Sequence, residues 1–197
     1  MSQAKGVQLT YDDGARAVEL AREAVEGFVV NGRREQPGSM IDAFYNRTGA
    51  FVRLESTRGR GSLRGCAGGY ESNDQLGHVI VDAAIDAASE DSCGSEVTPT
   101  ELSSLTVSVC CVCNVVLTDD PVADMELGTH GVAIDTGSER GWLYPTVPVE
   151  HGWSEAEYLG RVCRKAGLPP MAWQQEDVMV TLFEGQIFRE RKPEGSI

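Results

Sequence analysis

One stretch of ten residues limits the possible folds of this chain more than any other. Residues 61–70 read GSLRGCAGGY, and half of them are glycine or alanine. Because glycine lacks a Cβ, its backbone can adopt a positive φ and approach another group closely. Side chains this small cannot fill a core, so something else must occupy the space beside them. That neighbour is either another segment of backbone or a substrate.

Two chemically active side chains lie within this stretch, at Arg64 and Cys66. Residues two apart on an extended backbone point to the same face. A guanidinium suits a carboxylate or phosphate, and a nearby cation favours the nucleophilic thiolate form of cysteine. One interpretation is therefore an anion-binding arginine beside a nucleophile. In the other interpretation, Cys66 is a small packed residue and Arg64 pairs with a structural carboxylate.

The motif around this pair resembles a known signature. Residues 63–66 read LRGC and are followed by Gly68, as in the AMMECR1 domain family of archaea and eukaryotes. Other segments resemble further blocks of that family: residues 49–54, 81–88, 143–153, 163–170 and 183–188. The resemblance covers about residues 10–190 as a single domain, and residues 191–197 are expected to form a polar tail.

The expected fold class is α+β. Several strands adjacent in sequence, with few crossover helices between them, favour a largely antiparallel sheet with flanking helices. The resemblance implies the same class, with a larger subdomain built from both chain ends and a smaller one built from the middle. It also implies a cleft between the two closely packed subdomains, with the motif beside it. Since such clefts often bind ligands, we expect Leu63, Gly65 and Gly68 to contact a substrate.

A second candidate segment follows at residues 144–153. Prolines stiffen its first half, and we expect Tyr144 and Pro145 to contact the substrate as well. Glu150 matches the family pattern, and it is a candidate general base or a partner for Arg64. His151 titrates near neutral pH and is suited to activating a thiol. The family usually carries tryptophan at that position, so we expect no family-wide role for His151.

Hydrophobic periodicity predicts the main elements. Helices are expected over residues 10–30, 76–89 and 154–166, and strands over residues 50–55, 105–117, 131–135, 141–144 and 178–189. A hairpin is expected to lead from the first strand into the strand that carries Arg64 and Cys66. Residue pairs with the spacing of a helix N-cap are Thr10 with Asp13, Ser72 with Gln75, and Ser154 with Glu157.

The charge of the chain is strongly negative. Thirty acidic residues against seventeen basic ones give a net charge of −13, and lysine occurs only at positions 5, 165 and 192. Such a surface repels phosphate backbones and disfavours nucleic-acid binding. It is typical of a protein adapted to a salty cytoplasm, where ions screen the self-repulsion. No membrane-spanning run and no secretory signal are visible, so a cytoplasmic location is expected.

Cysteines are the remaining candidates for chemistry. They occur at positions 66, 93, 110, 111, 113 and 163, and no CxxC pair is present. Disulfides are not expected in a cytosolic chain. The spacing at 110–113 is no standard zinc motif, so we predict no metal site. The sequence indicates no particular cofactor.

Three classes of function remain open. The first is an enzyme in which Cys66, Arg64 and Glu150 act on a small anionic or carbonyl-containing molecule. The second is a non-catalytic module that binds a partner protein or a metabolite. The resemblance implies Memo-type and radical-SAM proteins as possible partners, because family members are often fused to them or encoded beside them. The third, a nucleic-acid-associated regulator, is disfavoured by the charge, although Arg58, Arg60 and Arg64 would form a local basic patch.

Overall fold

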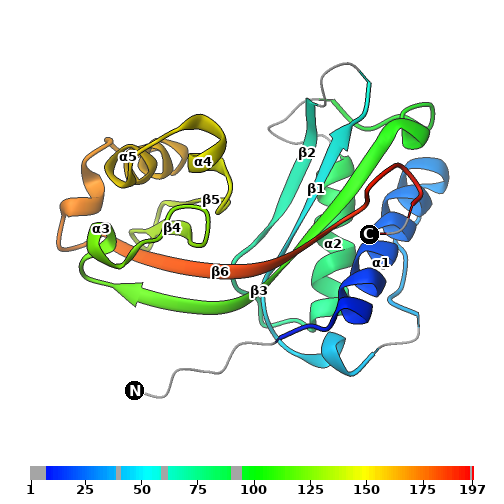
Figure 1. The fold of residues 1–197 in the computed structure, drawn as a ribbon, viewed down its shortest axis with the longest axis horizontal. Helices are drawn as coiled ribbons and strands as arrows, with labels where there is room; N and C mark the ends of the chain where they lie inside the picture. Colours follow the sequence, from blue (N-terminus) through cyan, green and yellow to red (C-terminus); the bar gives the residue numbers. More distant parts are fainter. Residues whose placement is uncertain (1–7, 39–40, 59–61, 90–94, 196) are drawn as a thin grey trace. The chain divides into compact units, whose positions relative to one another are not determined.

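A computed structural model describes residues 8–38, 41–58, 62–89, 95–195 and 197. It contains one six-stranded sheet in the order β2-β1-β3-β6-β4-β5 (Figure 1). The strands are β1 (Ala50–Ser56), β2 (Ser62–Gly69), β3 (Leu105–Thr118), β4 (Gly131–Asp135), β5 (Arg140–Leu143) and β6 (Met179–Arg189). The pairs β1–β2, β1–β3, β4–β5 and β4–β6 are antiparallel, which confirms the predicted α+β class. Arg60, Gly61 and Cys93 lie outside the described residues.

The chain divides into two compact units. Among the described residues, the large unit comprises residues 8–112 and 186–197, and the small unit comprises residues 113–185. Strands β3 and β6 contribute residues to both units. The motif strand β2 belongs to the large unit, and the second candidate segment belongs to the small unit.

The large unit packs two helices on one face of its strands. These are α1 (Tyr11–Asn31) and α2 (Leu76–Ala88), and Figure 1 shows both on the same side of β1 and β2. The strands contribute alternate residues to a single core, among them Val52, Leu54, Val107 and Val109. Residues between these in sequence, such as Arg53 and Ser108, therefore point to the opposite face of the sheet.

Helix α1 forms where the sequence predicts it. Thr10 and Asp13 make a reciprocal capping box: the Thr10 hydroxyl accepts from the Asp13 backbone N–H at 3.2 Å, and the Thr10 N–H donates to the Asp13 carboxylate at 2.9 Å. The helix ends at Asn31 and is capped by Gly32, whose φ of 62° is the left-handed conformation that glycine adopts without strain.

Helix α2 begins as predicted, but the predicted cap is wrong. Its N-cap residue is Gln75, and no side-chain hydrogen bond caps the helix. The Ser72 hydroxyl instead accepts from the backbone N–H of Asp74 at 3.0 Å, which makes a local turn ahead of the helix. The spacing of Ser72 and Gln75 fits a cap equally well, and the path of the chain decides against it.

The small unit has a core of its own. Helix α5 (Glu155–Lys165) covers one face of β4, and the core combines Val132, Ile134, Val180 and Leu182 with residues of α5. The predicted capping box of Ser154 and Glu157 is present at its start. The short helices α3 (Pro121–Asp124) and α4 (Val147–His151) also belong to this unit. Elsewhere in the chain, 3-10 turns occur at η1 (Asp42–Tyr45) and η2 (Leu102–Ser104), and a further one in this unit is η3 (Ala172–Gln174).

Within the described part of the chain, no helix is both long enough and apolar enough to cross a membrane.

Candidate functional site

The glycines of the motif strand are explained by close backbone contacts. A Cβ added to Gly65 would collide with the backbone carbonyl of Ala87 in α2. A Cβ added to Gly68 would collide with the carbonyl of Ala50 in β1, and the φ of Gly68 is +124°. Another segment of backbone, rather than a substrate, therefore occupies the space on the Cβ side of Gly65 and Gly68. The glycines let strand, helix and neighbouring strand pack at short range.

Cys66 lies on the face of the large unit's sheet that α1 and α2 do not cover. It pairs across β1 with Arg53, and Arg53 pairs on its other side with Ser108 of β3. Side chains of directly opposed residues lie on the same face, with Cβ atoms about 5 Å apart. Cys66 is half-buried, Ser108 is buried, and the Arg53 side chain is 14% exposed. The sheet therefore places a guanidinium, a thiol and a hydroxyl in one row.

An ion-pair network holds Arg53 in this row. Its guanidinium lies 3.0 Å from the Glu55 carboxylate on the same strand. The other oxygen of Glu55 lies 3.5 Å from the guanidinium of Arg189 in β6. Two arginines thus share the carboxylate of Glu55, and this ion pair orients the Arg53 guanidinium on the face that carries Cys66.

Arg53 is a site residue that the sequence alone does not reveal. The sequence feature that could have pointed to Arg53 is a charged residue inside an apolar strand, in the run AFVRLE. A charge at an alternate position of a strand usually marks a solvent-exposed face. Only the register of β1 on β2 brings this arginine opposite Cys66.

Arg64 lies at an irregularity of the strand pairing. Leu54 pairs with Gly65 but Glu55 pairs with Leu63, so Arg64 is an extra residue between them. Its spacing from Cys66 no longer guarantees a shared face. The Arg64 guanidinium instead binds the carboxylate of Glu101 at 2.7 and 3.2 Å.

Arg64 also contacts two backbone carbonyls. It donates to the carbonyls of Ser95 at 2.7 Å and Glu96 at 3.0 Å. Mainly because of the hydrogen bond from Arg64, the pKa of Glu101 is lowered to about 2. This arrangement fastens β2 to the segment ahead of β3. It matches the second interpretation of the sequence, in which Arg64 pairs with a structural carboxylate.

The remaining predicted residues are distributed between the two units. Leu63 is an exposed residue of β2 in the large unit. Tyr144 and Pro145 are buried in the small unit, directly after β5. Glu150 is exposed in α4, and its carboxylate accepts a hydrogen bond from the Thr146 hydroxyl at 3.0 Å.

His151 makes an aromatic contact rather than the thiol contact considered from the sequence. Its ring stacks on Trp153 with centroids 4.8 Å apart and an angle of 14° between planes. The Arg161 guanidinium also lies over the Trp153 ring, 5.0 Å from its centroid. The aromatic ring of His151 thus has a packing role in this stack.

The other described cysteines are buried or have a raised thiol pKa. Cys110, Cys111 and Cys163 are buried. Burial raises the pKa of the thiols of Cys113 and Cys163, so both stay protonated at neutral pH. Among the described residues, no cluster of three or more His, Cys, Asp or Glu side chains is arranged to hold a metal ion.

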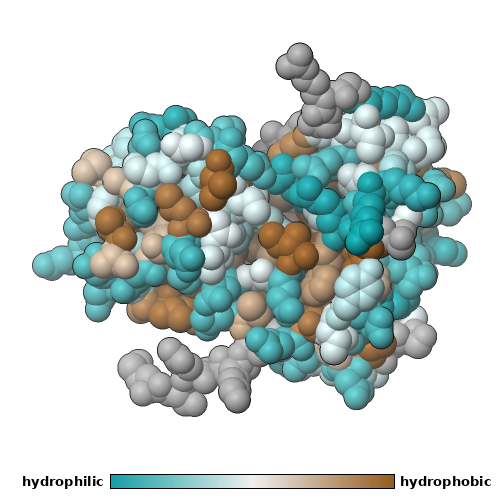
Figure 2. All heavy atoms as spheres, in the orientation of Figure 1, coloured by the Kyte–Doolittle hydropathy of each residue, from teal (hydrophilic) through white to brown (hydrophobic). Residues whose placement is uncertain are grey.

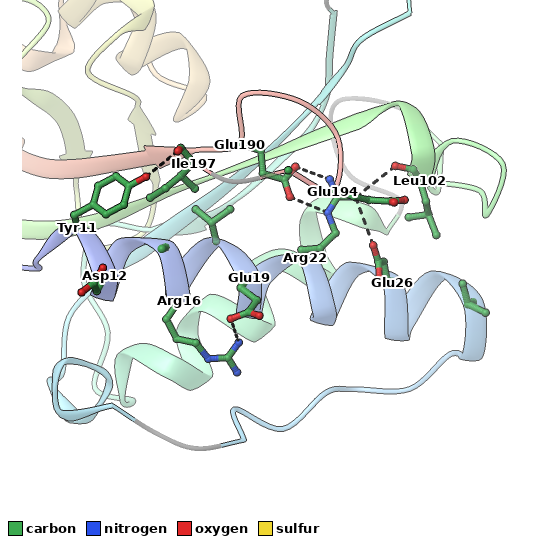
Figure 3. A pocket seen from close by; sticks show the side chains of 14 residues that line it. Tyr11, Asp12, Arg16, Glu19, Arg22, Glu26, Leu102, Glu190, Glu194 and Ile197 are labelled. Atoms are coloured by element: carbon green, nitrogen blue, oxygen red, sulfur yellow. Dashed lines mark hydrogen bonds and ion pairs between the residues drawn. The ribbon is translucent and has the colours of Figure 1, made fainter.

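A separate groove of about 890 Å³ lies in the large unit, between α1 and the C-terminal segment (Figure 3). Its wall includes a buried ion pair, in which Arg22 contacts both carboxylate oxygens of Glu190 at 3.0 and 2.6 Å. Burial, and then the acidic neighbours Glu194 and Glu190, raise the pKa of Glu26, against the opposing effect of Arg22. None of the predicted site residues lines this groove.

The fold and this row of side chains define an α+β protein with a half-buried cysteine in its motif strand. The sequence pattern of the AMMECR1 family matches residues 18–188, and the chain belongs to that family. Protein VNG_2543C of Halobacterium salinarum is 68% identical over 197 residues, which cover 96% of this chain and 94% of that protein. This similarity agrees with the expected halophilic archaeal origin.

More distant relatives share the whole domain. Protein MJ0810 of Methanocaldococcus jannaschii is 36% identical, with 96% of each chain covered. The crystal structure of the uncharacterized protein PH0010 from Pyrococcus horikoshii superimposes with a TM-score of 0.86 at 33% identity, covering 92% of this chain and 93% of that chain. The family and the fold predicted from the motif are both confirmed.

Proposed function

We propose that this AMMECR1 protein is an enzyme, or a component of one, that uses the Cys66 thiol on a small anionic or carbonyl-containing substrate. The observation that carries the proposal is the direct pairing of Cys66 with Arg53 on the sheet face opposite α1 and α2. A guanidinium beside a half-buried thiol supplies both the thiolate and a site for a negatively charged group.

The chemistry follows from the charges. The Cys66 thiolate would attack an electrophilic carbonyl carbon, forming a C–S bond while the C=O π electrons move to the oxygen. The Arg53 guanidinium would bind either that oxyanion or a carboxylate of the substrate. In this proposal Arg64, held by Glu101, positions β2. A substrate anion that binds Arg64 must compete with the Glu101 carboxylate. We assign to Glu150 the role of general base, and to Leu63, Tyr144 and Pro145 contacts with the substrate. Gly65 and Gly68 would contact it only through their backbone groups, because other backbone fills the space where their Cβ atoms would lie.

The test measures Cys66 alkylation by mass spectrometry across pH, with the other five cysteines as internal controls. We expect fast labelling with a midpoint below the ~8.5 of a free cysteine. The negatively charged reagent iodoacetate should react at least as fast as neutral iodoacetamide, despite the net charge of −13. Arg53→Gln should remove this preference for the anion, whereas Arg53→Lys should retain much of it.

The control is Arg64→Gln, because Arg64 is bound to a carboxylate of its own. An inert Cys66, or an iodoacetate-to-iodoacetamide ratio unchanged in Arg53→Gln, would contradict the proposed site.

A second candidate is a non-catalytic binding module. The structural roles of Arg64, Gly65 and Gly68 support it, because a motif explained by packing needs no chemistry. Cys66→Ser distinguishes the enzyme from the binding module: it should abolish turnover in an enzyme and be nearly harmless in a binding module.

We also propose Memo-type and radical-SAM proteins as partners, to be tested by co-purification with the parent chain and with the Cys66→Ser variant.

Nucleic-acid recognition is the least supported function. Of the arginines in the basic patch considered from the sequence, Arg64 is bound to Glu101 and Arg58 donates to the carbonyl of Thr100 at 3.1 Å. The strong negative charge adds to the argument, since phosphate contacts depend on free cations.

A further inference from the structure

Among the residues that the structure describes, no strand pairs with one edge of the second half of β3. Strand β1 pairs with β3 only as far as Ala50 opposite Cys111. Just beyond, the Val112 N–H donates to the Gly49 carbonyl at 3.0 Å, and the Val112 carbonyl accepts from the Thr48 hydroxyl at 2.8 Å. In the sheet order, β3 lies between β1 and β6. Residues 113–118 therefore have β6 on one side and, within the described ranges, no strand on the other.

The alternation of the strand shows which backbone groups face this edge. In an antiparallel ladder, the N–H and C=O of one residue point to the same side, and the next residue points to the other. Both groups of Val112 point toward β1. Val107, five residues earlier, directs both groups toward the β6 side, where it bonds Glu190. By the same alternation, Asn114, Val116 and Thr118 present their backbone groups to the open edge.

The side chains along this edge are unusually apolar. Val115, Val116 and Leu117 are 43%, 37% and 62% exposed. Figure 2 shows hydrophobic side chains gathered where the end of β3 lies in Figure 1. Natural edge strands are normally protected against pairing by lysine, proline, a bulge or an inward-pointing charge. Residues 113–118 contain no charged residue, no proline and no glycine.

We propose that this edge pairs with the same edge of a second copy of the chain, so that the protein forms a two-fold symmetric dimer through β3. Charge and strand register both fit this occupant. Residues 102–118 carry no charge, in a chain whose net charge is −13. Salt screens much of the repulsion between two acidic copies, and an uncharged edge adds no like-charge contact of its own.

The pattern of backbone groups also defines the register. An antiparallel pair centred on Val116 places Val116 opposite Val116 of the second copy and Asn114 opposite its Thr118, so every edge-facing group named above finds a partner. Val115 then lies opposite Leu117 of the second copy, which buries the exposed side chains. Asp119 falls opposite Cys113 of the second copy, so no acidic residue faces another.

The test is the oligomeric state of the full chain, measured by sedimentation velocity over a range of concentrations in molar KCl. We expect a reversible dimer. Val116→Pro should leave only the monomer, because it removes an edge-facing N–H without breaking the ladder to β6. Val116→Lys should raise the dissociation constant at least about tenfold, because the two-fold axis brings the two lysines together.

The matched control is Val122→Lys. Val122 is 42% exposed on α3 of the same unit but lies off the strand edge, so this variant should dimerise as the parent chain does. Circular dichroism establishes that each variant is folded. A parent chain that stays monomeric, or a dimer that Val116→Pro and Val116→Lys leave intact, overturns the proposal. A monomer that dimerises only after deletion of residues 1–7 overturns it too, because the chain would then cover its own edge.

Discussion

Two arginines of the large unit bind a glutamate with the same geometry in very different surroundings. The Arg22–Glu190 pair is almost fully buried, with side chains 9% and 3% exposed. The Arg64–Glu101 pair is half-buried, with side chains 17% and 27% exposed. Both are long-range contacts that hold separate segments together. The difference in burial decides how each responds when one partner is removed.

The buried pair is satisfied by more than its two charges. Arg22 also donates to the Leu105 carbonyl at 2.7 Å, and Glu190 accepts from the Val107 backbone N–H at 3.0 Å. The pair therefore connects α1, β3 and the end of β6. A buried ion pair adds little net stability over an apolar replacement, but removing only one partner leaves an uncompensated buried charge. The Arg64–Glu101 pair has water nearby to replace a lost partner.

Arg22→Met should have the largest effect. It leaves Glu190 buried without its cation, and we expect a loss of about 3–5 kcal/mol in the free energy of unfolding. Arg16→Met is the control on the same helix, because Arg16 pairs with exposed Glu19 and Glu23 and should cost under about 1 kcal/mol. Denaturant unfolding in molar KCl measures both. Equal losses in the two variants would show that burial does not distinguish these pairs.

Gly65→Ala should come next, and it tests whether the motif strand is limited by packing. The new Cβ meets the Ala87 backbone, which cannot rotate away, so we expect a loss of about 1–3 kcal/mol. Gly69→Ala is the control, because a Cβ there meets only the Glu71 carbonyl oxygen at 3.7 Å, an ordinary contact. If Gly65→Ala were as stable as the parent chain, the close contact with α2 would not be the reason for glycine.

Glu101→Gln should have a smaller effect that depends on pH. The folded-state pKa of Glu101 is lowered to about 2 from 4.5, so its carboxylate stabilises the fold above pH 4.5 and loses that contribution as the pH falls toward 2. With solvent screening, we expect about 1–2 kcal/mol at pH 7. The difference between parent and variant, measured by unfolding at several pH values, should shrink on acidification. A difference that stays constant down to pH 2 would argue against the ion pair as its source.

Cys66→Ser should have the smallest effect on stability. The side chain is half-buried and the replacement is nearly isosteric, so we expect a change under about 1 kcal/mol. Alkylation at neutral pH should nevertheless lose its fastest-reacting site, which peptide mass spectrometry detects. Loss of the folded state in this variant would assign Cys66 to packing rather than to chemistry.

Local signals in the sequence determined much of this molecule. The capping boxes of Thr10 with Asp13 and Ser154 with Glu157 need only residues three apart, and both helices begin there. The apolar alternation of residues 105–117 predicts β3 because a strand buries every second side chain. The LRGC run and the other segments that resemble the family predicted membership, which the match over residues 18–188 confirms.

Only the tertiary structure decided what lies beside the motif. The register of β1 on β2 places Arg53 opposite Cys66, and the extra residue in β2 turns Arg64 toward Glu101, which is 37 positions away in sequence. The contact of Gly65 with Ala87 and the open edge of β3 likewise depend on segments far apart in the chain. Spacing along a sequence defines neighbours on one element, whereas pairing between elements depends on how the whole sheet and its helices pack.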